Sequence, residues 1–186
     1  MKKLLGTMVL MMGLDLFGAT ERVDYSATSS KVQRRQLAGE NSGFTVAGAS
    51  IVSFGVAPRL QWPSADYEIT GFRLNLFTGE HVDVYGLDFG VIGNFVKREI
   101  GGVQMAGVFN VVGESGGALQ FATLCNYCKG DFGGVQLGLI NITEKGRGFQ
   151  LGIVNWADIL YGVQVGVINY NAASSLPIAP FFNCAF

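Results

Sequence analysis

The chain of 186 residues is poor in groups that carry chemistry: it has one histidine and three cysteines, and only 15% of its residues are charged. His81 has no second histidine or cysteine pair near it in the sequence, so we expect a polar hairpin loop from Thr78 to Asp83 and no metal site. The odd number of cysteines excludes a fully paired intramolecular disulfide framework. A net charge of −1 gives no electrostatic basis for binding nucleic acid.

The motifs that resemble catalytic sites are incomplete. Gly113–Gly117 matches the Gly-x-Ser-x-Gly pattern of a nucleophile elbow, but the only histidine precedes Ser115, so we interpret this segment as a turn between strands. Cys125 and Cys128 have the spacing of a redox motif without the helix N-terminus that lowers a thiol pKa. They are interpreted as small apolar residues or, alternatively, as a local disulfide. We therefore predict that the chain is not an enzyme and binds no cofactor.

What the chain has in abundance is a repeat. The phrase is Gly-apolar-Gln-apolar-Gly/Ala, followed within a few residues by Asn. The Gln or Asp position recurs at intervals of 16, 16, 16, 14 and 14 residues, which is the length of one β-strand and one turn. We predict structural roles for the two series that this phrase defines: Asp88, Gln104, Gln120, Gln136, Gln150 and Gln164, and Asn94, Asn110, Asn126, Asn141, Asn155 and Asn169.

Three regions follow one another along the chain. In residues 1–19, Lys2 and Lys3 precede an apolar stretch that is too short to span a bilayer, and small residues follow, which is the layout of a secretory signal peptide. Residues 20–43 are polar and aperiodic and are expected to be a flexible leader. Residues 44–186 contain the repeats and are expected to be one β domain.

Alternation within the repeats predicts which side chains share a face. Large apolar residues such as Met105, Phe121 and Leu137 alternate with Gln, Asn and small residues, as in a membrane barrel whose apolar face meets lipid and whose polar face lines the lumen. Charges fall between the repeats, where we expect the connections. The leading prediction is therefore an all-β antiparallel meander, closed into a small outer-membrane β-barrel of about eight to ten strands.

Two details refine the barrel hypothesis. In the 14-residue repeats Asn lies five residues after Gln, so a bulge just before Asn, or a turn starting at it, must restore the alternation. The large residue after each Asn would contribute to two interfacial girdles, and the terminal Phe186 resembles the end of outer-membrane barrels. The girdle residues are Phe95, Val111, Tyr127, Ile142, Trp156 and Tyr170.

The alternative is a parallel β-solenoid in which each 14–16-residue repeat forms one coil and Gln and Asn stack as ladders. It explains why every repeat carries the same phrase, which is unexpected when alternate strands run in opposite directions. It must, however, accommodate large aromatic residues on a narrow coil and the polar segment Thr143–Arg147. The sequence leaves both architectures open.

The repeats, with the segments Pro58–Trp62, Gly71–Leu76 and Asp83–Asp88, resemble a bacterial family described as surface repeat-containing proteins. The resemblance covers about residues 50–186. It implies an exported protein of the outer membrane or cell surface of a Gram-negative-type bacterium, and it supplies no catalytic residue. The expected function is structural or interactive, with outer-membrane lipid and a protein or host-surface ligand as possible partners; the alternative is a soluble exported adhesion module.

Overall fold

The computed structural model describes residues 46–186, and this part of the chain is all-β. It has eleven strands joined in one sheet. They are β1 (Gly48–Ala57), β2 (Leu60–Trp62), β3 (Tyr67–Asn75), β4 (Thr78–Gly90), β5 (Gly93–Ala106), β6 (Phe109–Val112), β7 (Ser115–Ala122), β8 (Cys125–Leu137), β9 (Ile140–Leu151), β10 (Val154–Asn171) and β11 (Ile178–Ala185). In this sheet β6 and β7 both lie between β5 and β8.

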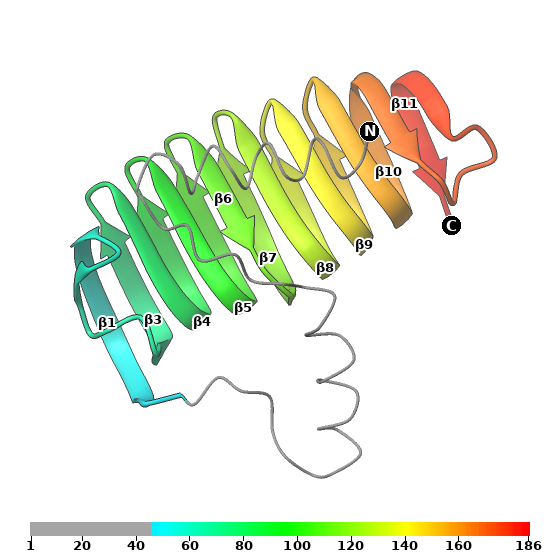
Figure 1. The fold of residues 1–186 in the computed structure, drawn as a ribbon. Coiled ribbons are helices and arrows are strands. Elements are labelled where there is room, and N and C mark those ends of the chain that lie inside the picture. Colours follow the sequence, from blue (N-terminus) through cyan, green and yellow to red (C-terminus); the bar gives the residue numbers. More distant parts are fainter. Residues whose placement is uncertain (1–45) are drawn as a thin grey trace, which may run out of the picture. The chain divides into compact units, whose positions relative to one another are not determined.

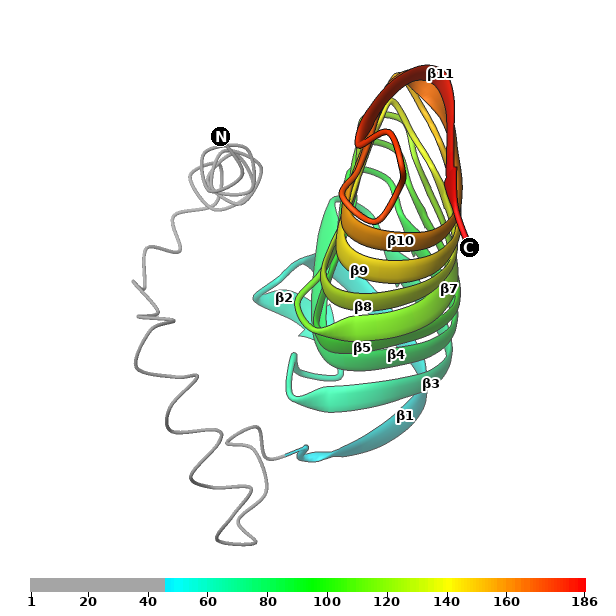
Figure 2. The same cartoon turned by 90° about the vertical axis from the view of Figure 1, so that its right-hand side faces the viewer.

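Successive strands from β3 to β10 pair in parallel, and each repeat lies directly on the previous one (Figures 1 and 2). Gln120, for example, is opposite Gln104 on one side and Gln136 on the other. The result is a β-solenoid of about seven coils. The predicted antiparallel barrel is therefore wrong and the alternative is correct, because parallel stacking places the same residue of every repeat side by side.

The coils turn at two edges of the stack. The apolar edge consists of the short turns 91–92, 107–108, 123–124, 138–139 and 152–153, together with residues 167–168. The charged edge consists of segments 97–99, 113–115, 129–131, 144–147 and 158–161. Strands β5, β8, β9 and β10 bend through the charged edge without a break. In these coils the connections predicted at the charged segments lie instead at the apolar edge, half a coil away.

The apolar edge also explains the spacing of Asn in the 14-residue repeats. A two-residue turn at Gly138–Leu139 ends β8, and Asn141 is the second residue of β9. The turns before Asn141 and Asn155 reset the alternation, so neither a bulge nor a turn starting at Asn is needed there. No turn precedes Asn169, and the register of β10 against β11 shifts between Gly166 and Asn169, as a bulge would produce. Asn141, Asn155 and Asn169 all point inward and are fully buried.

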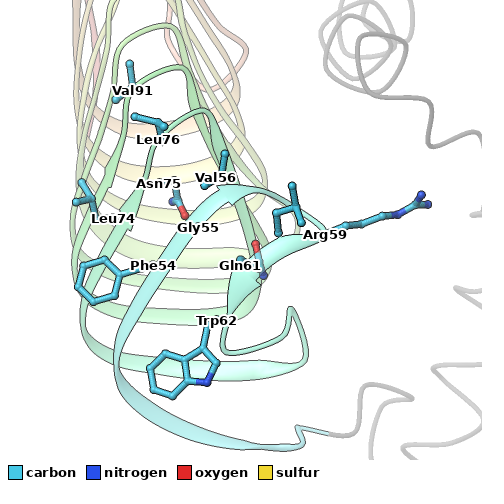
Figure 3. A pocket seen from close by; sticks show the side chains of 11 residues that line it. Phe54, Gly55, Val56, Arg59, Gln61, Trp62, Leu74, Asn75, Leu76 and Val91 are labelled. Carbon is cyan, nitrogen blue, oxygen red and sulfur yellow. The ribbon is translucent and has the colours of Figure 1, made fainter.

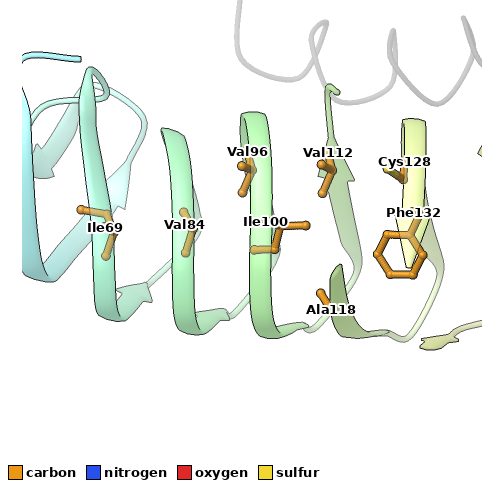
Figure 4. Packing of buried hydrophobic residues seen from close by; sticks show 8 residues of the cluster. All are labelled: Ile69, Val84, Val96, Ile100, Val112, Ala118, Cys128 and Phe132. Atoms are coloured by element: carbon orange, nitrogen blue, oxygen red, sulfur yellow. The ribbon is translucent and has the colours of Figure 1, made fainter. Parts of the chain in front are cut away.

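A small apolar core lies inside the stack towards the charged edge (Figure 4). One of its columns alternates large and small residues over successive coils, in the order Ile100, Gly116, Phe132, Gly146 and Leu160. Coils about 4.8 Å apart leave too little room to stack large side chains directly. A Cβ at Gly116 would lie 2.2 Å from Cγ2 of Ile100, so these glycines make room for their neighbours.

In five of the six copies, the phrase begins with a glycine whose φ is positive; the third copy has Ala118 there. Gly134 and Gly148 have φ values of 138° and 139°, which L-residues rarely adopt. A Cβ at Gly148 would lie 1.9 Å from the carbonyl oxygen of Gly134 in the coil below. The glycine therefore allows the coils to approach to hydrogen-bonding distance.

Side-chain amides complete the sheet near both ends of the stack. The Gln61 side chain donates to the carbonyl oxygen of Glu80 and accepts from its N–H, as a neighbouring strand would. Asn171 makes the same pair of bonds with the backbone of Leu160. Antiparallel strands β2 and β11 pair with β1 and β10. These contacts leave fewer unpaired backbone groups at the ends, which are the positions where strands add.

The predicted signal peptide (1–19) and leader (20–43) lie outside the described residues. Within residues 46–186, no helix has the length and apolar character needed to cross a membrane.

Candidate functional site: amide ladders, a buried ion pair and an apolar surface

The glutamine series forms a continuous hydrogen-bonded ladder inside the solenoid. Each Nε2 donates to the side-chain oxygen of the preceding coil at 2.7–2.9 Å, beginning with Gln164 and ending where Gln104 donates to Asp88. All six side chains are buried. The structure thus brings together Asp88, Gln104, Gln120, Gln136, Gln150 and Gln164.

The asparagine series forms a second ladder that runs in the opposite direction. Each Nδ2 donates to Oδ1 of the following coil at 2.8–3.1 Å, from Asn75 to Asn169. From Asn94 to Asn155, Nδ2 also donates to a carbonyl oxygen one or two residues before the chain next reaches the apolar edge, as from Asn126 to Leu137 at 2.8 Å. The Asn side chains therefore tie each turn of the apolar edge to its neighbour.

Opposite directions give the two ladders opposed amide dipoles. Hydrogen bonds in a chain polarise one another, so each ladder has a positive and a negative end. The positive end of the glutamine ladder meets the Asp88 carboxylate, whereas its negative end is Oε1 of Gln164. The negative end of the asparagine ladder is Oδ1 of Asn75, and both terminal oxygens are buried without a donor.

A buried ion pair ends the glutamine ladder. Nε and Nη2 of Arg73 donate to the two Asp88 oxygens at 2.6 and 2.5 Å, and both side chains have no solvent exposure. Nη1 of Arg73 donates to the carbonyl oxygen of Phe95 and lies 3.2 Å from Nδ1 of His81. Since arginine only donates, Nδ1 must be the acceptor nitrogen of a neutral imidazole, and Nε2 carries the hydrogen towards Ser53.

His81 is held neutral by its surroundings. Burial, reinforced by the Arg73 guanidinium, lowers the pKa of His81 from 6.5 to about 3, and the Pro63 carbonyl opposes this shift. His81 is a fully buried residue of β4, so the predicted hairpin loop at Thr78–Asp83 is wrong. No group of three or more His, Cys, Asp or Glu residues within 46–186 is placed to hold a metal ion.

Charges gather at the charged edge and near it. Asp83 accepts two hydrogen bonds from the Arg98 guanidinium and a third from the N–H of Glu99 at 3.0 Å. The hydrogen bond with Asp83 raises the pKa of Arg98. Lys97 lies 3.2 Å from Glu80 in a more exposed pair. These contacts link neighbouring coils at the charged edge, but their charged groups do not gather around a common binding position.

The outer face over the glutamine ladder is apolar. One column precedes each Gln and one follows it, and both run through all the stacked coils. Leu87, Phe121 and Leu151 are each more than 40% exposed, which is unusual for such large apolar side chains in a row. The first column is Phe72, Leu87, Val103, Leu119, Val135, Phe149 and Val163; the second is Leu74, Phe89, Met105, Phe121, Leu137, Leu151 and Val165.

The opposite face carries the residues that follow each Asn. They form a single column and not the two girdles predicted for a barrel, because all strands run in the same direction. Trp156 and Tyr170 stack in this column with ring centroids 4.1 Å apart. Tyr127, Trp156 and Tyr170 lie partly exposed on the outside of the coil, which answers the objection that a narrow solenoid could not accommodate them.

An open pocket of about 740 Å³ lies between the β1–β2 hairpin and the first coils (Figure 3). Phe54, Trp62 and Leu74 line it, and Leu76 and Val91 connect it with the apolar edge. The polar lining residues are Asn75, Gln61 and Arg59. The Gln61 amide and Nδ2 of Asn75 are engaged in the contacts described above, whereas Oδ1 of Asn75 has no donor. The pocket is thus the N-terminal end of the apolar surface.

Within residues 46–186, the two motifs that resemble catalytic sites, at Ser115 and at Cys125 and Cys128, form no hydrogen bond with each other or with His81. Ser115 begins β7, just after the break at Gly113–Glu114 where a turn was predicted, and its Oγ is 3.5 Å from Glu99. Cys125 and Cys128 are free and buried, and burial raises the pKa of both thiols to about 12. At neutral pH they are therefore protonated and unreactive.

Comparison with known protein families, curated proteins and solved structures gives no match.

Sequence reasoning did not anticipate the Arg73–Asp88–His81 cluster. The signal was present, because Asp88 replaces Gln in one repeat and Arg73 replaces it in the preceding one. Arg73 and Asp88 carry opposite charges at the Gln position of adjacent repeats. They predict an ion pair once the coils are known to stack in register.

Proposed function

We propose that the chain is a non-enzymatic, exported β-solenoid that acts as a binding or adhesion module at a bacterial cell surface. The observation that carries this proposal is the apolar outer surface. Side chains at equivalent positions repeat over the stacked coils with no charged residue among them. Contiguous exposed apolar patches of more than a few hundred Å² generally mark interaction sites, and repeat proteins bind through extended surfaces of this kind.

The polar interior supports a structural role. The Gln and Asn amides, Arg73 and Asp88 have no solvent exposure and bind one another. Such groups cannot reach a substrate without opening the coil. The surface is therefore the part of the molecule available for function.

The export component rests on residues 1–19 and on the resemblance to surface repeat-containing proteins. It is tested by producing the full chain in a Gram-negative bacterium and treating intact cells with a protease. We expect a mature N-terminus close to Thr20 and cleavage of the protein from outside. A chain that keeps Met1 and stays protected inside the cell contradicts this component.

The binding component is tested separately with a dye that fluoresces on apolar protein surfaces. The folded chain should bind it, and the double variant Leu119→Gln/Phe121→Gln should bind much less. A variant with Lys145→Gln and Arg147→Gln at the charged edge is the matched control. Absence of dye binding by the folded wild-type chain contradicts the proposed role of the surface.

A further inference from the structure

From Gly101 to Phe186, charged residues are confined to the charged edge and its flanks. Segments 101–112, 116–128, 132–143, 148–157 and 159–186 contain no Asp, Glu, Lys or Arg. Together they form both outer faces next to the apolar edge and the edge itself. Val91, Leu124, Leu139, Ile153 and Val167 of that edge are each more than 40% exposed. The solenoid is thus amphipathic from one edge to the other.

The backbone of the apolar edge is suited to an environment without water. In successive turns the N–H of Leu124, Leu139 and Ile153 donates to a carbonyl of the preceding coil, at 2.8–3.3 Å. Asn side chains bind the carbonyls at the strand ends. Hydrocarbon tolerates only backbone whose polar groups are paired within the protein, and the N–H and carbonyl groups named here meet that condition.

The distances along the coil match the layers of a membrane interface. Met105 and Val103 lie two and four residues before the turn at 107–108, which is about 7 to 13 Å along an extended strand. The column that includes Tyr127, Trp156 and Tyr170 begins about 10 Å beyond the turn on the other face. Interfacial segments bury apolar side chains about 5–10 Å deep, and Trp and Tyr collect at that boundary.

We propose that the apolar edge of the solenoid inserts into the interfacial layer of a lipid bilayer, with the charged edge left in water. This inference rests on the proposed function and names the partner of its surface. A second copy of the chain would cover one flat face and leave the edge and the other face exposed. A bilayer covers all three, because its hydrocarbon adapts to a convex edge.

The first test is flotation with vesicles of zwitterionic phosphatidylcholine, using the full chain. The triple variant Leu124→Gln/Leu139→Gln/Ile153→Gln removes apolar side chains from three consecutive turns without adding charge. We expect its apparent affinity to fall by about tenfold or more. The control Asp131→Asn/Lys145→Gln/Arg147→Gln, at the charged edge, should bind as the wild type does. Circular dichroism and thermal unfolding verify that each variant is folded.

The second test locates the contact, because the apolar stretch in residues 4–14 is present in every variant and could itself bind lipid. A polarity-sensitive fluorophore is attached at Leu139→Cys or at Arg147→Cys in a Cys184→Ser background, in which only the buried cysteines remain. On binding vesicles, the label at 139 should shift to the blue and be quenched by brominated acyl chains. The label at 147 should do neither.

Three results would overturn the lipid assignment: no flotation, equal flotation of both triples, or labels at 139 and 147 that both stay in water. Sedimentation tests instead for a dimer of the wild-type chain. A dimer that is lost only in the apolar-edge triple variant would show that the surface binds a second copy of the chain. If the dye still binds the folded chain in any of these cases, the surface keeps its role in binding and only its partner changes. Failure of both dye and vesicles removes the proposed function itself.

Discussion

Gln104 donates a hydrogen bond from Nε2 to Oδ2 of Asp88 at 2.9 Å, and through this bond the glutamine ladder ends on a carboxylate. The same carboxylate holds the Arg73 guanidinium, so Asp88 joins an uncharged ladder to a buried cation. The aligned amides of the ladder also place their positive end towards Asp88. The stability of the N-terminal coils should therefore depend on this residue more than on any single amide of the ladder.

Asp88→Asn keeps an acceptor for Gln104 but leaves Arg73 as an unpaired buried charge. We expect a loss of about 3–5 kcal/mol in the free energy of unfolding, measured in urea. Asp131→Asn, at the exposed charged edge, should change it by about 0.5 kcal/mol or less. The double variant Arg73→Gln/Asp88→Gln extends the ladder by two amides and should regain much of the loss. Similar costs for Asp88→Asn and Asp131→Asn would contradict the buried ion pair.

Gln136→Ala should be more costly than Gln164→Ala. Gln136 donates to Gln120 and accepts from Gln150, so its removal leaves a buried donor and a buried acceptor unsatisfied. We expect a loss of about 2–4 kcal/mol. Gln164 ends the ladder, and its Oε1 accepts from no donor. Its removal therefore leaves only two acceptors without this donor, Oε1 of Gln150 and the carbonyl oxygen of Tyr170. A buried carbonyl oxygen without a partner costs less than a buried N–H without one. Chemical unfolding of both variants checks the order, and the reverse order contradicts the ladder's direction.

Neighbouring glycines should respond differently to alanine. Gly134 has a positive φ, and a Cβ there would lie 2.1 Å from the carbonyl oxygen of Ala118; Gly133 has open space within 4 Å. Gly134→Ala should destabilise the chain by about 3 kcal/mol or more, combining backbone strain and a clash between coils. Gly133→Ala should change stability by about 0.5 kcal/mol or less. Thermal unfolding of the pair provides the measurement, and equal effects would show that the coils are not stacked as described.

Acid should destabilise the fold through His81. Its pKa is about 3 in the folded chain and 6.5 ordinarily, so between these values the unfolded chain binds a proton that the folded chain does not. The stability contributed by neutral His81 is complete above pH 6.5 and is lost as the pH falls towards 3. His81→Gln removes this dependence while the carboxyl groups titrate in both proteins. The wild type should therefore lose more stability than the variant between pH 7 and 4, and parallel curves would contradict the neutral histidine.

Period and composition predicted an all-β repeat domain, and the alternation of Gln with Phe, Met and Leu distinguished two faces. Strand direction could not be predicted, because an apolar outer face and an amide inner face suit both a lipid-facing barrel and a solenoid. The prediction that turns lie at the charged segments was wrong for most coils. In most soluble proteins charged residues mark connections, whereas here β5 and β9 continue through Lys97–Glu99 and Glu144–Arg147.

The Arg73–Asp88 pair and the opposed ladders depend on contacts between repeats. They become predictable only when the coil register is fixed, because Asp88 is 15 residues from Arg73 and 16 from Gln104. The register in turn depends on the turns at the apolar edge. Those turns contain Gly107 and Gly138. The turns could not be predicted from these glycines, because small residues that point inward are equally compatible with a continuous strand.

Parallel, in-register stacking is tested most directly by nuclear Overhauser contacts of the Gln120 side-chain amide in the folded full chain. The solenoid places Nε2 of Gln120 at 2.8 Å from Oε1 of Gln104, and Gln136 donates to Gln120 at 2.9 Å. We predict contacts from the Gln120 amide protons to the side chains of both Gln104 and Gln136. Contacts to residues on a hairpin partner across segment 113–116, with none to Gln104 or Gln136, would contradict the solenoid.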